Sequence, residues 1–119
     1  MQKKPIIIKR AYQTPLAEDG YRVLVDRLWP RGLKKEALAL QEWNKQVAPS
    51  TVLRKWFGHD PTRFELFSQR YQEELAQHQA ELKRLNGLRY QQTLCLVYAA
   101  KDEVHNHAQV LKQVLEQLG

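Results

Sequence analysis

The first cluster of side chains with the chemistry of a binding or catalytic site follows directly on an apolar run. Residues 26 to 32 read Asp-Arg-Leu-Trp-Pro-Arg-Gly, so a carboxyl group and two guanidinium groups lie beside a turn. Arg27 and Arg31 have the planar, bidentate geometry that suits a phosphate. A partly desolvated Asp26 needs a cationic partner, or its pKa rises. The cluster predicts an anion site with a titratable acid; the alternative is an Asp26–arginine pair that only fixes the turn.

A second cluster follows another apolar run, Thr93 to Ala100. Lys101, Asn106 and His107 lie at the expected start of the last helix, whose free N–H groups and dipole favour an anion. Lys101 supplies charge to a phosphate, His107 is a candidate general acid or base together with Asp26, and Asn106 is a candidate for orienting the substrate. The alternative is a helix capped by Asp102, with solvated histidines.

A third segment lies between these clusters and adds two residues to the predicted anion site. Ser50 follows a proline and is a candidate cap for a short helix that ends before Gly58. Arg54 lies one helical turn further along. We expect Ser50 and Arg54 to bind the same anion as the two arginines of the first cluster.

The sequence lacks the common cofactor and metal motifs. There is no P-loop, no Gly-x-Gly-x-x-Gly and no Gly-x-Ser-x-Gly. His105 and His107 are two residues apart, which does not match the spacing of a helical zinc pair. We therefore expect no metal and no cofactor. Cys95 lies within an apolar run, so we expect a buried, unreactive thiol.

Three apolar runs are predicted to form strands that position the two clusters: Ile6 to Ile8, Tyr21 to Leu28 and Thr93 to Ala100. Continuous apolar runs are typical of strands covered on both faces. Helical spacing between Phe64 and Leu85 predicts one helix of about six turns, and the C-terminus forms another. The fold class is α/β: a small, mainly parallel sheet of about three strands flanked by helices in three layers. Ligands bind at the carboxyl ends of such strands, where both clusters lie.

Length and charge narrow the possible functions. The 119 residues fit one domain that spans 1–119. The net charge of +6 favours an anionic small molecule or nucleic acid as partner, although it also serves solubility alone. A single cysteine excludes an internal disulfide. No apolar stretch is long enough for a signal peptide or a bilayer span, so we expect a cytoplasmic protein with no membrane partner.

The motifs of this chain resemble a known family. The Asp-Arg-Leu-Trp-Pro-Arg-Gly string, then Trp-Asn-Lys at 43 to 45, Ala-Pro-Ser at 48 to 50 and Tyr-Ala-Ala-Lys-Asp at 98 to 102 occur in one order. This order is similar to the domain of unknown function 488 family, in its short YeaO-like branch. The resemblance implies a compact α/β fold and assigns no reaction. Longer members tend to carry Cys-His-Arg where this chain has Asn106-His107-Ala108, which leaves His107 as the common element.

Three functions remain open on these residues. The leading hypothesis is a basic pocket that binds a phosphate-bearing or nucleotide-like small molecule through Arg27, Arg31, Arg54 and Lys101. If the pocket is catalytic, a hydrolase or transferase acting on a nucleoside or nucleotide is the class to test first. The second hypothesis is a non-catalytic nucleic-acid-binding protein that stacks bases on Trp29 and Trp43. The third is a structural or partner-binding module.

Overall fold

The structure, a computed structural model, describes residues 2–118 and contains a four-stranded parallel sheet. The strands are β1 (Ile6–Arg10), β2 (Tyr21–Leu24), β3 (Glu42–Trp43) and β4 (Leu94–Tyr98), in the spatial order β1-β4-β2-β3. All three pairings are parallel. The α/β class is confirmed, and each of the three expected apolar runs contains a strand, although β2 ends at Leu24 and not at Leu28. The fourth strand, β3, pairs only two residues with β2, too few for an apolar pattern in the sequence.

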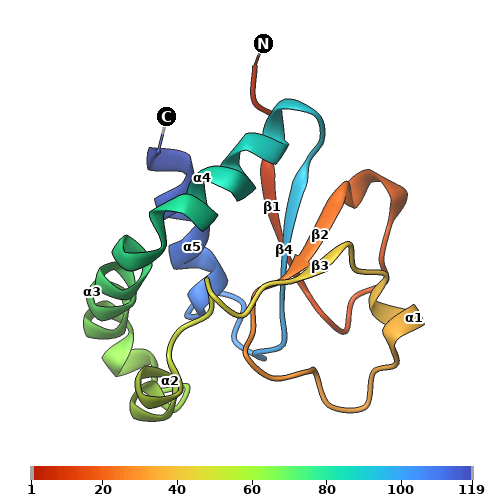
Figure 1. The fold of residues 1–119 in the computed structure, drawn as a ribbon. Helices are drawn as coiled ribbons and strands as arrows, with labels where there is room; N and C mark the ends of the chain where they lie inside the picture. The colour runs from red at the N-terminus through yellow and green to blue at the C-terminus, as the bar shows by residue number, and fades with distance from the viewer. Residues whose placement is uncertain (1, 119) are drawn as a thin grey trace.

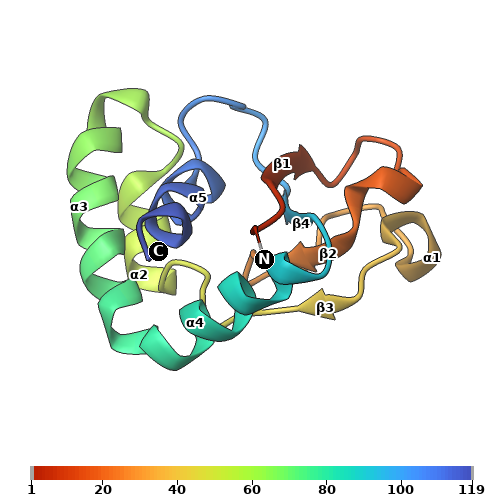
Figure 2. The ribbon, with the colours of Figure 1, turned by 90° about the horizontal axis from the view of Figure 1, so that it is seen from above.

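The helices lie on both faces of the sheet but in unequal number. They are α1 (Lys35–Leu38), α2 (Thr51–Phe57), α3 (Phe64–Leu75), α4 (Gln79–Gly87) and α5 (His107–Gln117). Helices α2 to α5 cover one face, and the short α1 lies on the other side (Figures 1 and 2). The sheet therefore separates a large apolar cluster from a small one.

Strand β4 lies in the middle of both clusters, which explains its continuous apolar run. Leu94 and Leu96 face the large cluster, whereas Cys95 and Val97 face the small one. All four side chains are completely buried. Burial raises the pKa of the Cys95 thiol to about 11, so the thiolate that reacts with electrophiles does not form near neutral pH. The expectation of a buried Cys95 is confirmed.

The long helix expected from the spacing of apolar residues is divided in two. Helix α3 ends at Leu75, a 3-10 turn spans Ala76–His78, and α4 then begins with a new direction (Figure 1). The apolar stripe is nevertheless continuous, because Leu75 and Leu82 on either side of the turn are both buried. The stripe thus indicates which residues enter the core but not the bend that lets both helices follow the sheet.

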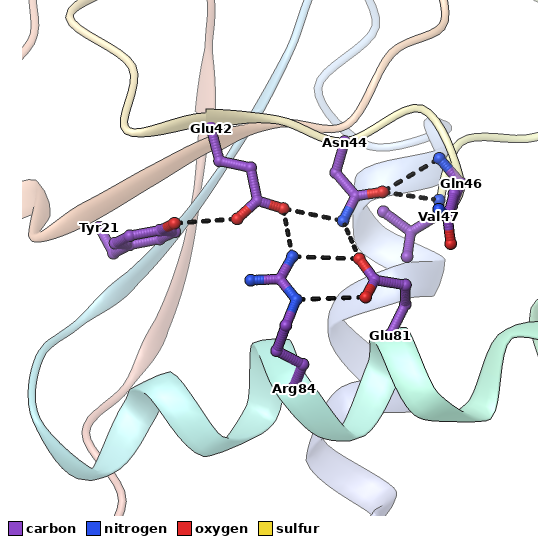
Figure 3. A network of polar contacts seen from close by, with 7 residues as sticks. All are labelled: Tyr21, Glu42, Asn44, Gln46, Val47, Glu81 and Arg84. Carbon is purple, nitrogen blue, oxygen red and sulfur yellow. Dashed lines mark hydrogen bonds and ion pairs between the residues drawn. The ribbon is translucent and has the colours of Figure 1, made fainter.

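A polar network fastens the edge strand β3 to helix α4 (Figure 3). Glu42 accepts hydrogen bonds from the Tyr21 hydroxyl at 2.9 Å and from the Asn44 amide at 2.9 Å. Arg84 of α4 bridges Glu42 and Glu81. Oδ1 of Asn44 accepts hydrogen bonds from the backbone N–H groups of residues 46 and 47, in the turn that follows β3. The network therefore fixes the start of the segment that leads into α2.

Replacing Arg84 with Met should lower the free energy of unfolding by about 1 kcal/mol at pH 7, because the ion pairs are partly exposed. Arg84 lowers the pKa of Glu81 directly, and its hydrogen bond helps to outweigh the opposing effect of burial on the pKa of Glu42. Lowered carboxyl pKa values give stability that is present above the unfolded-state pKa and is lost as the pH falls through the folded-state pKa. The difference from wild type should therefore shrink between pH 7 and about pH 3.

Urea unfolding at both pH values measures this difference. Lys83→Met is the matched control, since Lys83 is exposed and has no ion-pair partner within residues 2–118. An equal loss of stability in Arg84→Met at both pH values would contradict the electrostatic explanation.

Candidate functional site

A cleft of about 730 Å³ lies at the carboxyl ends of β2 and β4. Its walls come from the loop after β2, from helix α2 and from the loop that joins β4 to α5, all at the lower end of the sheet in Figure 1. Seven of the eight predicted site residues line it: Asp26, Arg27, Arg31, Arg54, Lys101, Asn106 and His107. Residues that are distant in the sequence thus meet at the carboxyl ends of the parallel strands, where ligand sites form in such sheets.

Asp26 and His107 form the most tightly connected pair in the cleft. Oδ1 of Asp26 lies 2.8 Å from Nε2 of His107, and the other carboxylate oxygen accepts the backbone N–H of Ala99 at 3.0 Å. Nε2 also lies 3.0 Å from the carbonyl oxygen of Val25. Both neighbours of Nε2 are acceptors, so this nitrogen carries a proton and Nδ1 is the basic nitrogen of the neutral ring. Asp26 therefore lies against His107 and not against an arginine of its own turn, while its Oδ1 accepts no hydrogen bond within residues 2–118.

The four predicted cationic residues reach the cleft without a carboxylate partner. Arg27 donates from Nε to the carbonyl oxygen of Pro49 at 2.7 Å, which holds its side chain against the start of α2. Nε of Arg54 is buried and has no hydrogen-bond partner in the described part of the chain. Arg31 and Lys101 are exposed. Within residues 2–118, none of the four forms an ion pair, so their positive charge remains available to a ligand.

Asn106, rather than Asp102, caps helix α5. Oδ1 of Asn106 accepts the N–H of Gln109 at 3.1 Å, and its amide nitrogen donates to the carbonyl oxygen of Asp102 at 2.9 Å. The expectation that Asp102 caps this helix is wrong. A helix capped by Asp102 would begin at residue 103, whereas α5 begins at His107. The amide oxygen and the amide nitrogen of Asn106 thus both form hydrogen bonds, and the residue is 1% exposed. These contacts hold the loop before α5 in place.

Asp102 instead organises the loop before α5. Its Oδ1 accepts the N–H groups of Val104 and His105, each at 2.9 Å, and its Oδ2 lies 2.9 Å from Nδ1 of His105. The backbone N–H of His105, followed by that of Val104, lowers the pKa of Asp102 to about 2. The charge of Asp102 is thus used within the loop and does not neutralise the cationic side chains of the cleft.

Ser50 is the one predicted site residue that the structure places outside the cleft. Its hydroxyl caps α2 as expected, by accepting the N–H of Leu53 at 3.1 Å. The same hydroxyl donates to Glu74 at 2.6 Å, and the Ser50 N–H donates to the other carboxylate oxygen at 2.8 Å. Ser50 lines a separate, smaller cavity of about 250 Å³. The expectation that it binds the anion is therefore corrected, because its hydroxyl is already used by Glu74 and the helix.

Several aromatic and apolar residues of the cleft were not assigned to a site from the sequence. Tyr12 and Leu28 line the cleft and remain 46% and 60% exposed. Phe57 and Phe67, whose rings stack at 4.3 Å, are core residues that also reach the cleft wall. Tyr12 follows β1, so the strand-end rule applied to β1 would have identified it.

Trp29 and Trp43 are packed against each other rather than presented as open stacking platforms. Their ring centroids lie 5.4 Å apart in an edge-to-face arrangement. The indole N–H groups donate to the carbonyl oxygens of Leu33 and Asp26, each at 2.6 Å. The ammonium group of Lys45 covers the Trp43 ring at 4.2 Å. These contacts reduce the ring surface on which the bases of a single-stranded nucleic acid would stack.

In the described part of the chain, no three His, Cys, Asp or Glu side chains are grouped in a way that would hold a metal ion. The helices between residues 2 and 118 include none with the length and apolar character needed to cross a membrane.

Comparison with known proteins places this chain in a family. Residues 5–118 match the family model described as "Inactive DUF488-N3 subclade". The uncharacterized protein YeaO of Escherichia coli K12 is 50% identical over 110 residues, which cover 92% of this chain and 96% of that protein. The uncharacterized proteins Mb3100c of Mycobacterium bovis and Rv3073c of Mycobacterium tuberculosis are 43% identical over 110 residues, 91% of each chain. No solved structure matches. The chain belongs to the DUF488 family and is a YeaO-like member of it.

Proposed function

We propose that the cleft binds a phosphate-bearing small molecule. The observation that carries this proposal is the presence of four cationic side chains without carboxylate partners in one concave site: Arg27, Arg31, Arg54 and Lys101. Arginine binds phosphate oxygens through two parallel hydrogen bonds, which makes it the preferred residue for such ligands. A volume of about 730 Å³ is typical of a pocket for a small organic ligand.

Arg54 supports a ligand through its position, since it lines the cleft and forms no ion pair within residues 2–118. Its charge is therefore not neutralised by a carboxylate of the described chain. Helix α5 adds to the attraction, since it begins at the cleft with Asn106 and His107. The N–H groups of a first helical turn lack partners within the helix and favour an anion.

The Asp26–His107 pair favours a second candidate function, a hydrolase or transferase acting on the bound molecule. A protonated Nε2 facing Asp26 leaves Nδ1 to act as a general base, with the aspartate stabilising the imidazolium. Against turnover, the matching family model is described as inactive, and this chain has Asn106 and Ala108 where longer members of the family tend to carry Cys and Arg. We therefore place ligand binding without turnover first.

Replacing Arg54 with Met should lower the affinity for phosphate-bearing ligands by about 10-fold or more, because a charged hydrogen-bond donor is lost. Binding is measured by thermal shift and then by calorimetry, with nucleotides, nucleosides, sugar phosphates and short oligonucleotides as probes. A ligand that binds only the folded protein raises its melting temperature. The fold should tolerate the substitution, since Nε of Arg54 makes no hydrogen bond within residues 2–118.

Lys55→Met is the matched control, because Lys55 is the next residue of α2, is exposed and does not line the cleft. No shift with any phosphate-bearing probe would refute the proposal and favour a partner-binding module. A shift with oligonucleotides alone, lost between about 50 and 200 mM salt, would favour nucleic-acid binding instead. Hydrolysis of a bound nucleotide by wild type, absent in His107→Ala, would establish the catalytic alternative.

A further inference from the structure

We infer that the ligand is a nucleotide, whose base stacks on Tyr12 beside Leu28 while its phosphate lies at Arg27 and Arg54. This inference rests on the proposed function and names the chemical class of the ligand. The structure supports it through two exposed side chains with apolar surface, Tyr12 and Leu28, which line the same cleft as the four cationic side chains without carboxylate partners.

Tyr12 is held as a fixed, accessible ring at the mouth of the cleft. Its hydroxyl donates to the carbonyl oxygen of Arg31 at 2.9 Å. The guanidinium group of Arg10 covers one face, 5.1 Å from the ring centroid, and Arg10 is itself anchored by donating to the carbonyl oxygen of Ala100 at 2.9 Å. Tyr12 is nevertheless 46% exposed and lines the cleft, so the residue remains accessible to a ligand. A ring fixed in this way loses little conformational entropy on binding.

Leu28 is a second exposed side chain with apolar surface in the cleft. It lines the same cleft and is 60% exposed, whereas the neighbouring Pro30 is buried and Trp29 is partly buried. Exposed large apolar side chains gathered in a concave site mark a surface that binds an apolar or aromatic ligand group. A sugar phosphate or inorganic phosphate has no such group and would leave this part of the cleft in water.

Two of the four cationic residues of the cleft, Arg27 and Arg54, lie at helix α2. Arg27 is tied to Pro49, immediately before the helix, and Arg54 lies within it. Phe57 of α2 stacks on Phe67 of α3, and both line the cleft beside these arginines. A ligand that uses both the cationic and the apolar side chains of the cleft needs a phosphate and a flat, apolar ring on one small scaffold, and a nucleoside monophosphate has this composition.

Calorimetric titration of the full chain with the four nucleoside monophosphates, ribose 5-phosphate and inorganic phosphate tests the inference. Stacking of a base on an aromatic side chain should make the best nucleotide bind about 5- to 100-fold tighter than ribose 5-phosphate. Tyr12→Leu should remove most of this difference while leaving the affinity for ribose 5-phosphate unchanged. Tyr12→Phe keeps the ring and should keep the difference.

Two controls separate stacking from a change in the fold. Tyr90→Leu replaces a tyrosine of similar exposure that does not line the cleft, and it should alter neither affinity. Leu28→Ser should lower the affinity for the nucleotide alone, through an exposed side chain whose loss the core tolerates. Equal affinities for nucleotide and ribose 5-phosphate in wild type, or an equal loss of both in Tyr12→Leu, would overturn the inference and leave the phosphate site intact. No binding of any of the six probes would overturn the proposed function itself.

Discussion

Replacing Asp19 with Asn should lower the free energy of unfolding by about 3 to 5 kcal/mol, because the buried Arg22 and the partly buried Lys9 lose their counter-charge. Asp19 is 1% exposed and lies between Lys9 of β1 and Arg22 of β2. Its carboxylate accepts hydrogen bonds from Lys9 at 3.0 and 3.1 Å, from Arg22 at 2.8 Å and from the N–H of Leu16 at 3.0 Å. An amide keeps the shape but removes the charge that Lys9 and Arg22 require.

The pH dependence of this effect has a definite sign. Burial alone would raise the pKa of Asp19, but the N–H of Leu16 together with Lys9 and Arg22 outweighs burial and holds the pKa below its ordinary value. A depressed carboxyl pKa contributes stability above the unfolded-state pKa, and this stability is lost as the pH falls through the folded-state pKa. The difference in the free energy of unfolding between wild type and Asp19→Asn should therefore be largest at pH 7 and should decrease below about pH 4.

Chemical denaturation at several pH values measures this difference. Glu18→Gln is the matched control: Glu18 is the preceding residue, is exposed and has no ion-pair partner in the described part of the chain. It should change stability by less than about 0.5 kcal/mol. A similarly small effect of Asp19→Asn would show that the buried cluster does not need the aspartate charge.

Replacing Gly20 with Ala should destabilise the protein by about 4 kcal/mol, through backbone strain and a steric clash together. Gly20 has φ +72° and ψ −127°, a conformation that is essentially restricted to glycine. A Cβ at this position would overlap the backbone carbonyl oxygen of Thr93. That oxygen accepts the N–H of Tyr21 at 2.8 Å, the first contact between β2 and the start of β4, so neither chain can move without loss of sheet pairing.

Two other glycines separate the two causes. Gly32 has φ +82° but no atom within 4 Å of an added Cβ, so Gly32→Ala should cost only the strain of the left-handed conformation, about 1 kcal/mol. Gly87 lies in α4 with open space around it, and Gly87→Ala should stabilise the helix by about 0.5 to 1 kcal/mol. Thermal unfolding of the three variants should give this order. Equal effects of Gly20→Ala and Gly32→Ala would show that the contact with Thr93 is relieved at no cost.

Local sequence signals correctly indicated several elements. The apolar runs identified β1, β2 and β4, because buried strands of a parallel sheet carry apolar side chains on both faces. Ser50 and Gly58 marked the two ends of α2, since helix caps depend on one side-chain oxygen and one left-handed residue. The rule about strand ends also led to seven residues that line one cleft, whose role as a site stays a prediction.

Other features depend on contacts that no local pattern encodes. Strand β3 is defined by two residues that pair with β2 and by the bridge from Arg84 of α4 to Glu42. The bend between α3 and α4 follows from packing against the sheet, because the apolar stripe alone is equally compatible with one straight helix. Asp102 and Asn106 are both good capping residues. The loop between β4 and α5 extends to Asn106, which is therefore the residue that caps the helix.

The sequence by itself determined the fold class, the strands of the sheet centre and the end of the sheet at which charged residues gather. These properties follow from apolar periodicity and from the parallel direction of the strands, which are local or nearly local quantities. Only the tertiary structure decided which charged groups meet. Asp26 precedes Arg27 in the chain and yet lies against His107, while Arg54 reaches the cleft without a carboxylate partner. Such a contact depends on distance in space, and the contacts of Ala99 with Asp26 and of His107 with Val25 bring the β4–α5 segment to the end of β2.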